Sequence, residues 1–167
     1  RFLLASCFMS FAQVASAQAV PDDVARLEID TGWREADGSH LAGLTIHLAP
    51  GWKTYWRAPG DGGIPPRFNW SGSQNLSGAS VHFPVPDVSD INGIRTIGYK
   101  DAVTLPIRFR TVDPSQPVTL RGELELGVCE EICVPVTMTF QAVLPAKGQA
   151  TAHLKSTLKD RPKRGGA

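Results

Sequence analysis

The chain has 167 residues, of which 42% are hydrophobic, and its formal net charge is +1. This length is enough for one domain with a proper core. The near-neutral charge argues against a nucleic-acid partner and against a strongly charged substrate. A short basic run at 159–164 lies beside glycines near the C-terminus, and we interpret it as part of a solvated tail or linker.

The first segment of the chain has the pattern of a secretory signal peptide. Arg1 precedes an apolar stretch at 2–11, and the small residues at 15–17 form an A-x-A site. We therefore expect a signal peptide over 1–17, cleavage before Gln18 and a periplasmic mature chain. The apolar stretch is too short to cross a bilayer, so we expect the mature chain not to span the membrane.

Export would change what the three cysteines can do. Cys7 lies in the predicted signal segment and would be discarded. Cys129 and Cys133 would remain, in an oxidising compartment where two cysteines are able to pair.

From residue 25 onward, apolar and polar residues alternate in runs of strand length, and turn residues such as Asn92-Gly93 separate them. This pattern is typical of half-buried strands. We predict an all-β, immunoglobulin-like antiparallel β-sandwich of about seven strands over 18–147. The runs are 25–29, 44–48, 79–83, 103–109, 118–126 and 134–140.

Two features modify this pattern. Pro106 has no backbone N–H, so its strand lacks one hydrogen-bond donor at that position, which predicts a sheet edge or a bulge there. The segment 148–167 is interpreted as a tail or linker. Within it, Leu154 and Leu158 are one helical turn apart, which indicates a short helix over 150–159.

Three residues separate Cys129 from Cys133. An extended segment would hold the two Cα atoms roughly 13 Å apart, whereas a disulfide needs about 4.4–6.8 Å. A short hairpin loop would place the cysteines opposite each other. Alternation points the apolar residues of 124–128 and 134–136 inward, so both sulfurs are predicted on one face, away from the core.

The pair has three possible purposes. A disulfide that closes so short a loop stabilises a protein by only about 2 kcal/mol in the chain-entropy model, which is a weak staple. An accessible hairpin-tip disulfide is instead of the kind that exchanges with other thiols. We favour redox exchange by Cys129 and Cys133 over a structural disulfide, and metal binding is the third alternative.

Neighbouring side chains bear on these alternatives. Glu130 and Glu131 would raise the pKa of a nearby thiol, which suits a carrier that reacts only with a docked partner, although turn glutamates are more often just solvated. Paired thiolates suit Cu(I), yet the sequence offers no third ligand, so we expect no cofactor or metal and keep copper as a minority hypothesis. The histidines are widely spread: His40, His47, His82 and His153.

A cluster of large aromatic residues surrounds a Gly/Pro-rich segment. Our preferred interpretation is a packing cluster that fixes a loop against the sandwich. The alternative is a docking surface, because Trp and Tyr are common interface anchors. The residues are Trp52, Tyr55, Trp56 and Trp70.

Five short strings resemble the N-terminal domain of the thiol:disulfide interchange protein DsbD family, in the branch linked to suppression of copper sensitivity. The resemblance implies an immunoglobulin-like periplasmic domain. Such a domain takes electrons from a membrane-embedded partner through a thioredoxin-like module and passes them to periplasmic oxidoreductases. The strings lie at 51–61, 64–70, 98–106, 127–129 and 133–135.

The same resemblance assigns roles to residues. Cys129 and Cys133 would be the redox pair of a thiol–disulfide oxidoreductase, and Tyr99 would lie near a loop that caps the oxidised pair. Better-known members have five residues between the cysteines and aromatic residues in the cap. The corresponding stretch here, 90–96, has no aromatic residue, so a cap would use Ile91 or Ile94. The competing hypotheses are a non-catalytic partner-binding module with a structural disulfide and a periplasmic copper-binding protein.

Overall fold

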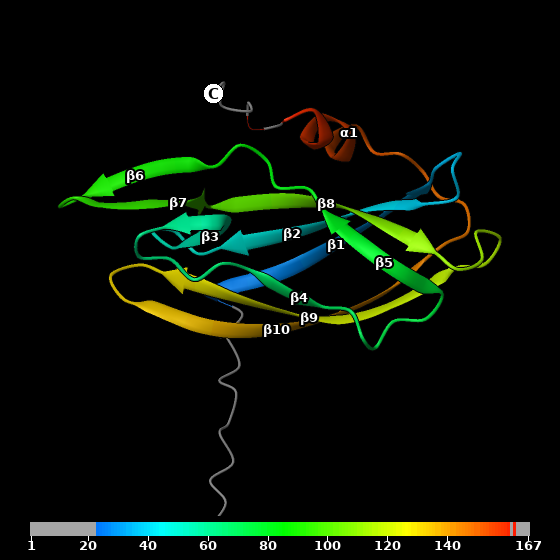
Figure 1. The fold of residues 1–167 in the computed structure, drawn as a ribbon, viewed down its shortest axis with the longest axis horizontal. Coiled ribbons are helices and arrows are strands. Elements are labelled where there is room, and N and C mark those ends of the chain that lie inside the picture. The colour runs from blue at the N-terminus through cyan, green and yellow to red at the C-terminus, as the bar shows by residue number, and fades with distance from the viewer. Residues whose placement is uncertain (1–22, 161, 163–167) are drawn as a thin grey trace, which may run out of the picture.

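The computed structural model describes residues 23–160 and residue 162. The predicted signal peptide at 1–17, with Cys7, lies outside the described residues. Two antiparallel sheets face each other, and one helix lies on the upper side in Figure 1. The elements are β1 (Ala25–Arg34), β2 (His40–Leu48), β3 (Lys53–Gly60), β4 (Arg67–Asn69), β5 (Leu76–Val81), β6 (Asp87–Ile91), β7 (Ile94–Lys100), β8 (Ala102–Thr111), β9 (Val118–Cys129), β10 (Cys133–Leu144) and α1 (Ala152–Lys159).

The four-stranded sheet has the order β1-β2-β8-β5, and the six-stranded sheet has the order β10-β9-β3-β7-β6, with β4 paired to β9. This arrangement confirms the predicted all-β, immunoglobulin-like class. The core lies between the sheets and follows the alternation seen in the sequence. Leu44, Ile46 and Leu105 of one sheet are nearly inaccessible, as are Leu124 and Leu126 of the other. Burying each such side chain stabilises the fold by about 1.5–3 kcal/mol.

β3 is a strand that the alternation in the sequence did not predict. Its pairing with β7 is irregular: Tyr55 lies opposite Gly98, but Gly60 lies opposite Thr96, so residues 56–59 bulge out. A bulge of this size breaks the two-residue alternation that identifies a strand. β3 nevertheless joins β9 to β7 at the centre of the six-stranded sheet.

The prediction for Pro106 is wrong. β8 lies between β2 and β5, and Pro106 pairs with Gly43 without a register shift. The carbonyl of Pro106 accepts a hydrogen bond from the amide of His82, just beyond the end of β5 at Val81. A residue's N–H and C=O point to the same side of an antiparallel strand. The missing donor therefore faces the side on which β5 has already ended.

The helix expected near the C-terminus forms as α1 and packs on the four-stranded sheet. Leu154 is fully buried, and its Cδ1 would lie 3.0 Å from a Cβ atom at Gly43, so the bare glycine makes room for it. Thr151 caps the helix by accepting from the amide of Leu154 and donates to Asp30 at 2.7 Å. The packed part of the fold thus reaches Lys159, within the segment interpreted as a tail.

A Leu154→Ala variant is expected to lose about 3 kcal/mol of unfolding free energy, because it removes a fully buried side chain and leaves a cavity. Urea denaturation of the purified chain measures this loss. Lys155→Ala on the exposed side of α1 is the matched control and should change the free energy by less than about 0.5 kcal/mol. Equal, small losses for both variants would mean that α1 does not contribute to the core.

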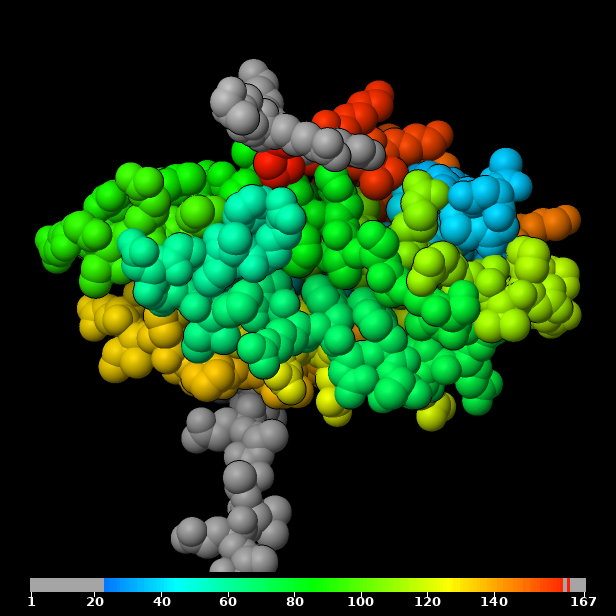
Figure 2. All heavy atoms as spheres, in the orientation of Figure 1, coloured from blue at the N-terminus to red at the C-terminus, as the bar shows by residue number. Residues whose placement is uncertain are grey.

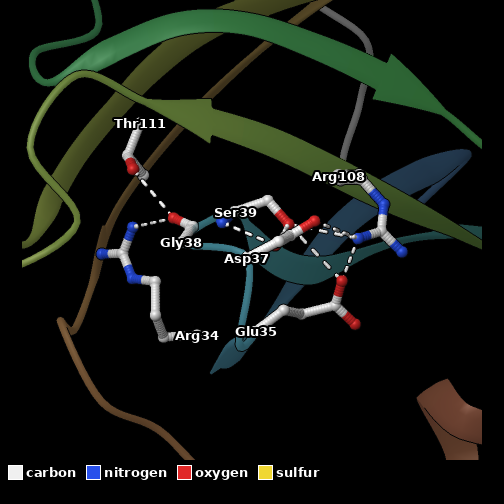
Figure 3. Close-up of polar contacts among 7 residues, drawn as sticks. All are labelled: Arg34, Glu35, Asp37, Gly38, Ser39, Arg108 and Thr111. Carbon is white, nitrogen blue, oxygen red and sulfur yellow. Dashed lines mark hydrogen bonds and ion pairs between the residues drawn. The ribbon is translucent and has the colours of Figure 1, made fainter.

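The turn between β1 and β2 is held by a polar network at the end of the sandwich opposite the β9–β10 hairpin (Figures 1 and 3). Arg108 contacts Glu35 and donates to Ser39 at 3.1 Å. Ser39 also donates to Asp37, and these hydrogen bonds lower the pKa of Asp37. The network fixes the turn and lies remote from the cysteines.

Candidate redox site

The β9–β10 hairpin holds the two cysteines at its tip. Cys133 lies directly opposite Cys129, and residues 130–132 form the connecting loop. The Cα atoms are 4.2 Å apart and the sulfurs are joined in a disulfide. Both strands alternate apolar and polar residues up to the loop, so the register follows from the sequence. The predicted hairpin-tip disulfide is confirmed.

The two cysteine residues differ in their access to solvent. Cys133 is exposed, but Cys129 is only 1% exposed. Directly opposed residues share a face of the sheet, so the prediction of a common face is confirmed. The prediction that both cysteines are accessible is wrong for Cys129, because a side chain from β3 covers it.

That side chain is Tyr55. Its hydroxyl lies 3.0 Å from Sγ of Cys129, to which it donates, and 3.1 Å from Sγ of Cys133. Tyr55 is only 2% exposed, and burial raises its pKa above that of an ordinary phenol. The hydroxyl therefore stays protonated at neutral pH and remains a hydrogen-bond donor to sulfur.

Two glycines make room for the ring of Tyr55. A Cβ atom at Gly127 would lie 3.3 Å from the ring and 2.7 Å from Ile64, and one at Gly63 would lie 2.5 Å from the ring. The segment after β3 therefore folds closely over the tyrosine. In Figure 2 this segment and β3 (teal) fill the space between the β6–β7 hairpin (green) and the β9–β10 hairpin (gold).

The stretch expected to cap the disulfide forms the β6–β7 hairpin. Asn92 and Gly93, with φ of 55° and 80°, make its turn, a conformation that suits Asn-Gly. Ile91 and Ile94 are 61% and 54% exposed. A methyl group of Ile94 approaches Gly62, whereas Tyr55 is the residue in contact with both sulfurs. A capping role for the two isoleucines stays a prediction.

Tyr99 lies on the opposite face of the same sheet. It pairs with Thr54, one residue before Tyr55, so its ring packs with the core instead of the sulfurs. Its hydroxyl donates to the carbonyl of Pro84 at 2.9 Å, and burial raises its pKa. The structure therefore brings Tyr55, and not Tyr99, to the disulfide.

Glu130 and Glu131 are exposed in the loop between the cysteines. Oε1 of Glu130 would be 3.0 Å from a Cβ atom at Gly51, so this carboxylate leans toward the turn before β3. An influence of the two glutamates on the thiols stays a prediction.

The other aromatic residues pack as expected. Trp70 stacks on Phe68 with ring centroids 5.1 Å apart and meets Phe109 and Phe140 edge-on. Trp52 and Trp56 also lie against the core. The packing interpretation is confirmed for these residues. The sequence treated Tyr55 as one of them, and only the pairing of β3 with β9 gives it a separate position.

In the part of the chain that the structure describes, no group of three or more His, Cys, Asp and Glu side chains is arranged to hold a metal ion. The histidines have separate partners in the fold. These partners are Thr31 for His40, Glu28 for His47, the carbonyl of Asp160 for His82 and Thr104 for His153.

The fold is an immunoglobulin-like sandwich that carries a cysteine pair in a disulfide at a hairpin tip. The family model "Thiol:disulfide interchange protein DsbD, N-terminal" matches residues 16–145. The chain belongs to this family, and the resemblance drawn from its sequence is confirmed.

Two solved structures are similar to the chain. The N-terminal periplasmic domain of ScsB from Proteus mirabilis is 32% identical with a TM-score of 0.68, and the match covers 90% of this chain and 60% of that one. The reduced N-terminal domain of DsbD from Neisseria meningitidis is 17% identical with a TM-score of 0.40, covering 73% of this chain and 86% of that one. The chain thus spans 60% of the length of the ScsB structure. A search of curated proteins found no match.

No helix among the described residues is both long and apolar enough to cross a membrane.

Proposed function

We propose that this chain relays electrons in the periplasm, from a membrane-bound reductant to periplasmic oxidoreductases, through Cys129 and Cys133. The observation that carries the proposal is the asymmetry of the disulfide: Cys133 is exposed while Cys129 is buried beneath Tyr55. A disulfide in which one of the two cysteine residues is exposed suits exchange with a docked partner.

Electron entry begins with a thioredoxin-like partner that carries two thiols. One thiolate of the partner attacks Sγ of Cys133 and forms a mixed disulfide. The bond between Cys133 and Cys129 breaks, and its electron pair leaves on Sγ of Cys129, which takes up a proton. The partner's second thiolate then attacks its own bridged sulfur and releases Cys133, so the partner becomes a disulfide and this domain a dithiol.

Electron delivery is the reverse sequence with a different partner. The thiolate of Cys133 attacks the disulfide of a periplasmic oxidoreductase, and Cys129 then attacks Sγ of Cys133 to release the reduced product. Tyr55 assists in both directions, because its neutral hydroxyl is already placed to donate a hydrogen bond to sulfur. A hydrogen bond to a thiolate stabilises the charged form.

Periplasmic location and thioredoxin-like partners are parts of this proposal. They are supported by membership of the DsbD N-terminal family and by the similarity to the periplasmic domain of ScsB. The signal-peptide pattern at 1–17 agrees with this location.

A redox titration tests the proposal. The chain from Gln18 onward contains only the two cysteines of the pair, and it is equilibrated in glutathione buffers before its free thiols are counted by alkylation and mass. We expect a reversible transition with a reduction potential above about −300 mV. A potential far below about −300 mV would identify a structural disulfide and contradict the relay.

A further inference from the structure

A row of four side chains crosses the outer face of the six-stranded sheet at the disulfide. Cys133 lies opposite Cys129, Cys129 lies opposite Lys53 of β3, and Lys53 lies opposite Lys100 of β7. Directly opposed residues of antiparallel strands point to the same face, with Cβ atoms about 4.5–5.5 Å apart. Cys129 therefore has its disulfide partner on one side and a lysine on the other.

The Lys53 side chain is half-buried, whereas Lys100 is exposed. Among the described residues, no ion pair or side-chain hydrogen bond engages either ammonium group. Asp87 is the carboxylate that shares a small cavity with Lys53, and it forms no ion pair with it. The charge of Lys53 is thus available to the neighbouring sulfur.

Other charged or titratable groups face the same region from each neighbouring element. Glu130 and Glu131 stand in the hairpin loop, with Glu130 turned toward Gly51. Asp87 of β6 lies opposite Gly98 and lines the same small cavity as Lys53 and Lys100. Asp61 accepts a hydrogen bond from the amide of Arg95.

Within the sheet itself, the two residues that flank Cys129 on its own face from β3 are Lys53 and Tyr55. Lys53 is directly opposite, and Tyr55 reaches the sulfur through its hydroxyl. Burial keeps this hydroxyl neutral. Lys53 is therefore the charged residue that the strand pairing places directly opposite the buried cysteine.

We propose that Lys53 is a positioning residue for the exchange reaction, whose ammonium group stabilises the thiolate of Cys129 when the disulfide opens. The inference rests on the proposed relay, in which Cys129 is the leaving sulfur during reduction and the resolving sulfur during delivery. An ammonium group beside a thiol favours the thiolate, and a more stable thiolate leaves faster. Lys53 would thus offset the opposite influence of the two loop glutamates.

The test is a titration of Cys129 as the single thiol of the chain. A Cys133→Ser background from Gln18 onward leaves only this thiol, and isotope-labelled cysteine reports its ionisation by NMR. We expect Lys53→Met to raise the pKa of Cys129 by about one unit, because the opposite charge is removed. Lys53→Arg should leave it within about 0.3 units of the parent value, since the charge is kept.

Lys100→Met is the matched control, because it removes the same charge one strand farther from the sulfur. Its effect should be less than half that of Lys53→Met. An unchanged pKa in Lys53→Met, or an equal shift in both variants, would overturn the assignment. Lys53→Gln gives the same reading with a polar side chain, in case the methionine variant does not fold.

The titration needs no partner, so its outcome is independent of the relay. If the redox titration gives a potential above about −300 mV but Lys53→Met leaves the pKa of Cys129 unchanged, the relay stands and this inference is wrong. If the redox titration instead identifies a structural disulfide while Lys53→Met raises the pKa of Cys129, the relay is wrong. The charge of Lys53 then acts on Cys129 but serves no exchange reaction.

Discussion

The Cys133→Ser variant is expected to lose thiol–disulfide exchange completely, whereas Cys129→Ser should still capture a partner. In Cys129→Ser the exposed residue Cys133 remains as a nucleophile, but the resolving thiol is gone, so the mixed disulfide accumulates. In Cys133→Ser the remaining cysteine is Cys129, a residue that is only 1% exposed and lies beneath Tyr55. Incubation of each reduced variant with oxidised glutathione, followed by intact-mass measurement, counts the adducts.

Both variants remove the same disulfide, so each serves as the stability control for the other. The short loop contributes only about 2 kcal/mol in the chain-entropy model, and both should stay folded. Adduct formation at equal rates in the two variants would contradict the asymmetry on which the relay depends.

Tyr55→Ala is expected to destabilise the chain by about 3–5 kcal/mol, because it removes a buried aromatic ring and leaves a cavity over the sheet. It should also uncover Cys129, so that this thiol reacts with an alkylating reagent as fast as Cys133 does. Denaturation by urea measures the first effect, and peptide mapping of the alkylated, reduced chain measures the second.

Tyr55→Phe separates the hydroxyl from the ring. It keeps the cover over Cys129 but removes the donor to sulfur, so reduction of the disulfide by dithiothreitol should slow while access to Cys129 stays low. Tyr99→Phe is the matched control, since its hydroxyl donates to Pro84 on the other face of the sheet. If Tyr55→Phe and Tyr99→Phe react at the same rate, the Tyr55 hydroxyl has no part in exchange.

The β9–β10 hairpin could be predicted from the sequence because the residues that determine it are close together in the chain. β9 and β10 alternate apolar and polar residues on both sides of a three-residue loop, and a disulfide at the tip follows from their register. The fold class follows from the same alternation in other strands. The turn at Asn92-Gly93 was also visible, but the strands on either side of it were not.

The cover over Cys129 could not be predicted in this way. Tyr55 is separated from Cys129 by 74 positions in the chain. The bulge in β3 and the proline at Pro59 break the alternation by which a strand is recognised in a sequence. Pairing β3 with β9 is a tertiary event, and it alone decides that Tyr55 and Lys53 face the disulfide. The error at Pro106 has the same origin, since the rule for proline is local whereas the end of β5 is not.

The most direct test of the central claim is to identify the sulfur through which a protein partner is joined to the oxidised chain. A reduced thioredoxin-like protein that lacks its second cysteine cannot resolve the mixed disulfide itself. Rapid acid quenching and alkylation of free thiols stop Cys129 from reversing the step, so the complex can be mapped by mass spectrometry. We predict a bond between the partner's remaining cysteine and Cys133, with Cys129 recovered as a free thiol. A bond between the partner and Cys129 would contradict the relay. So would recovery of the chain without a bound partner and with its own disulfide between Cys129 and Cys133 intact.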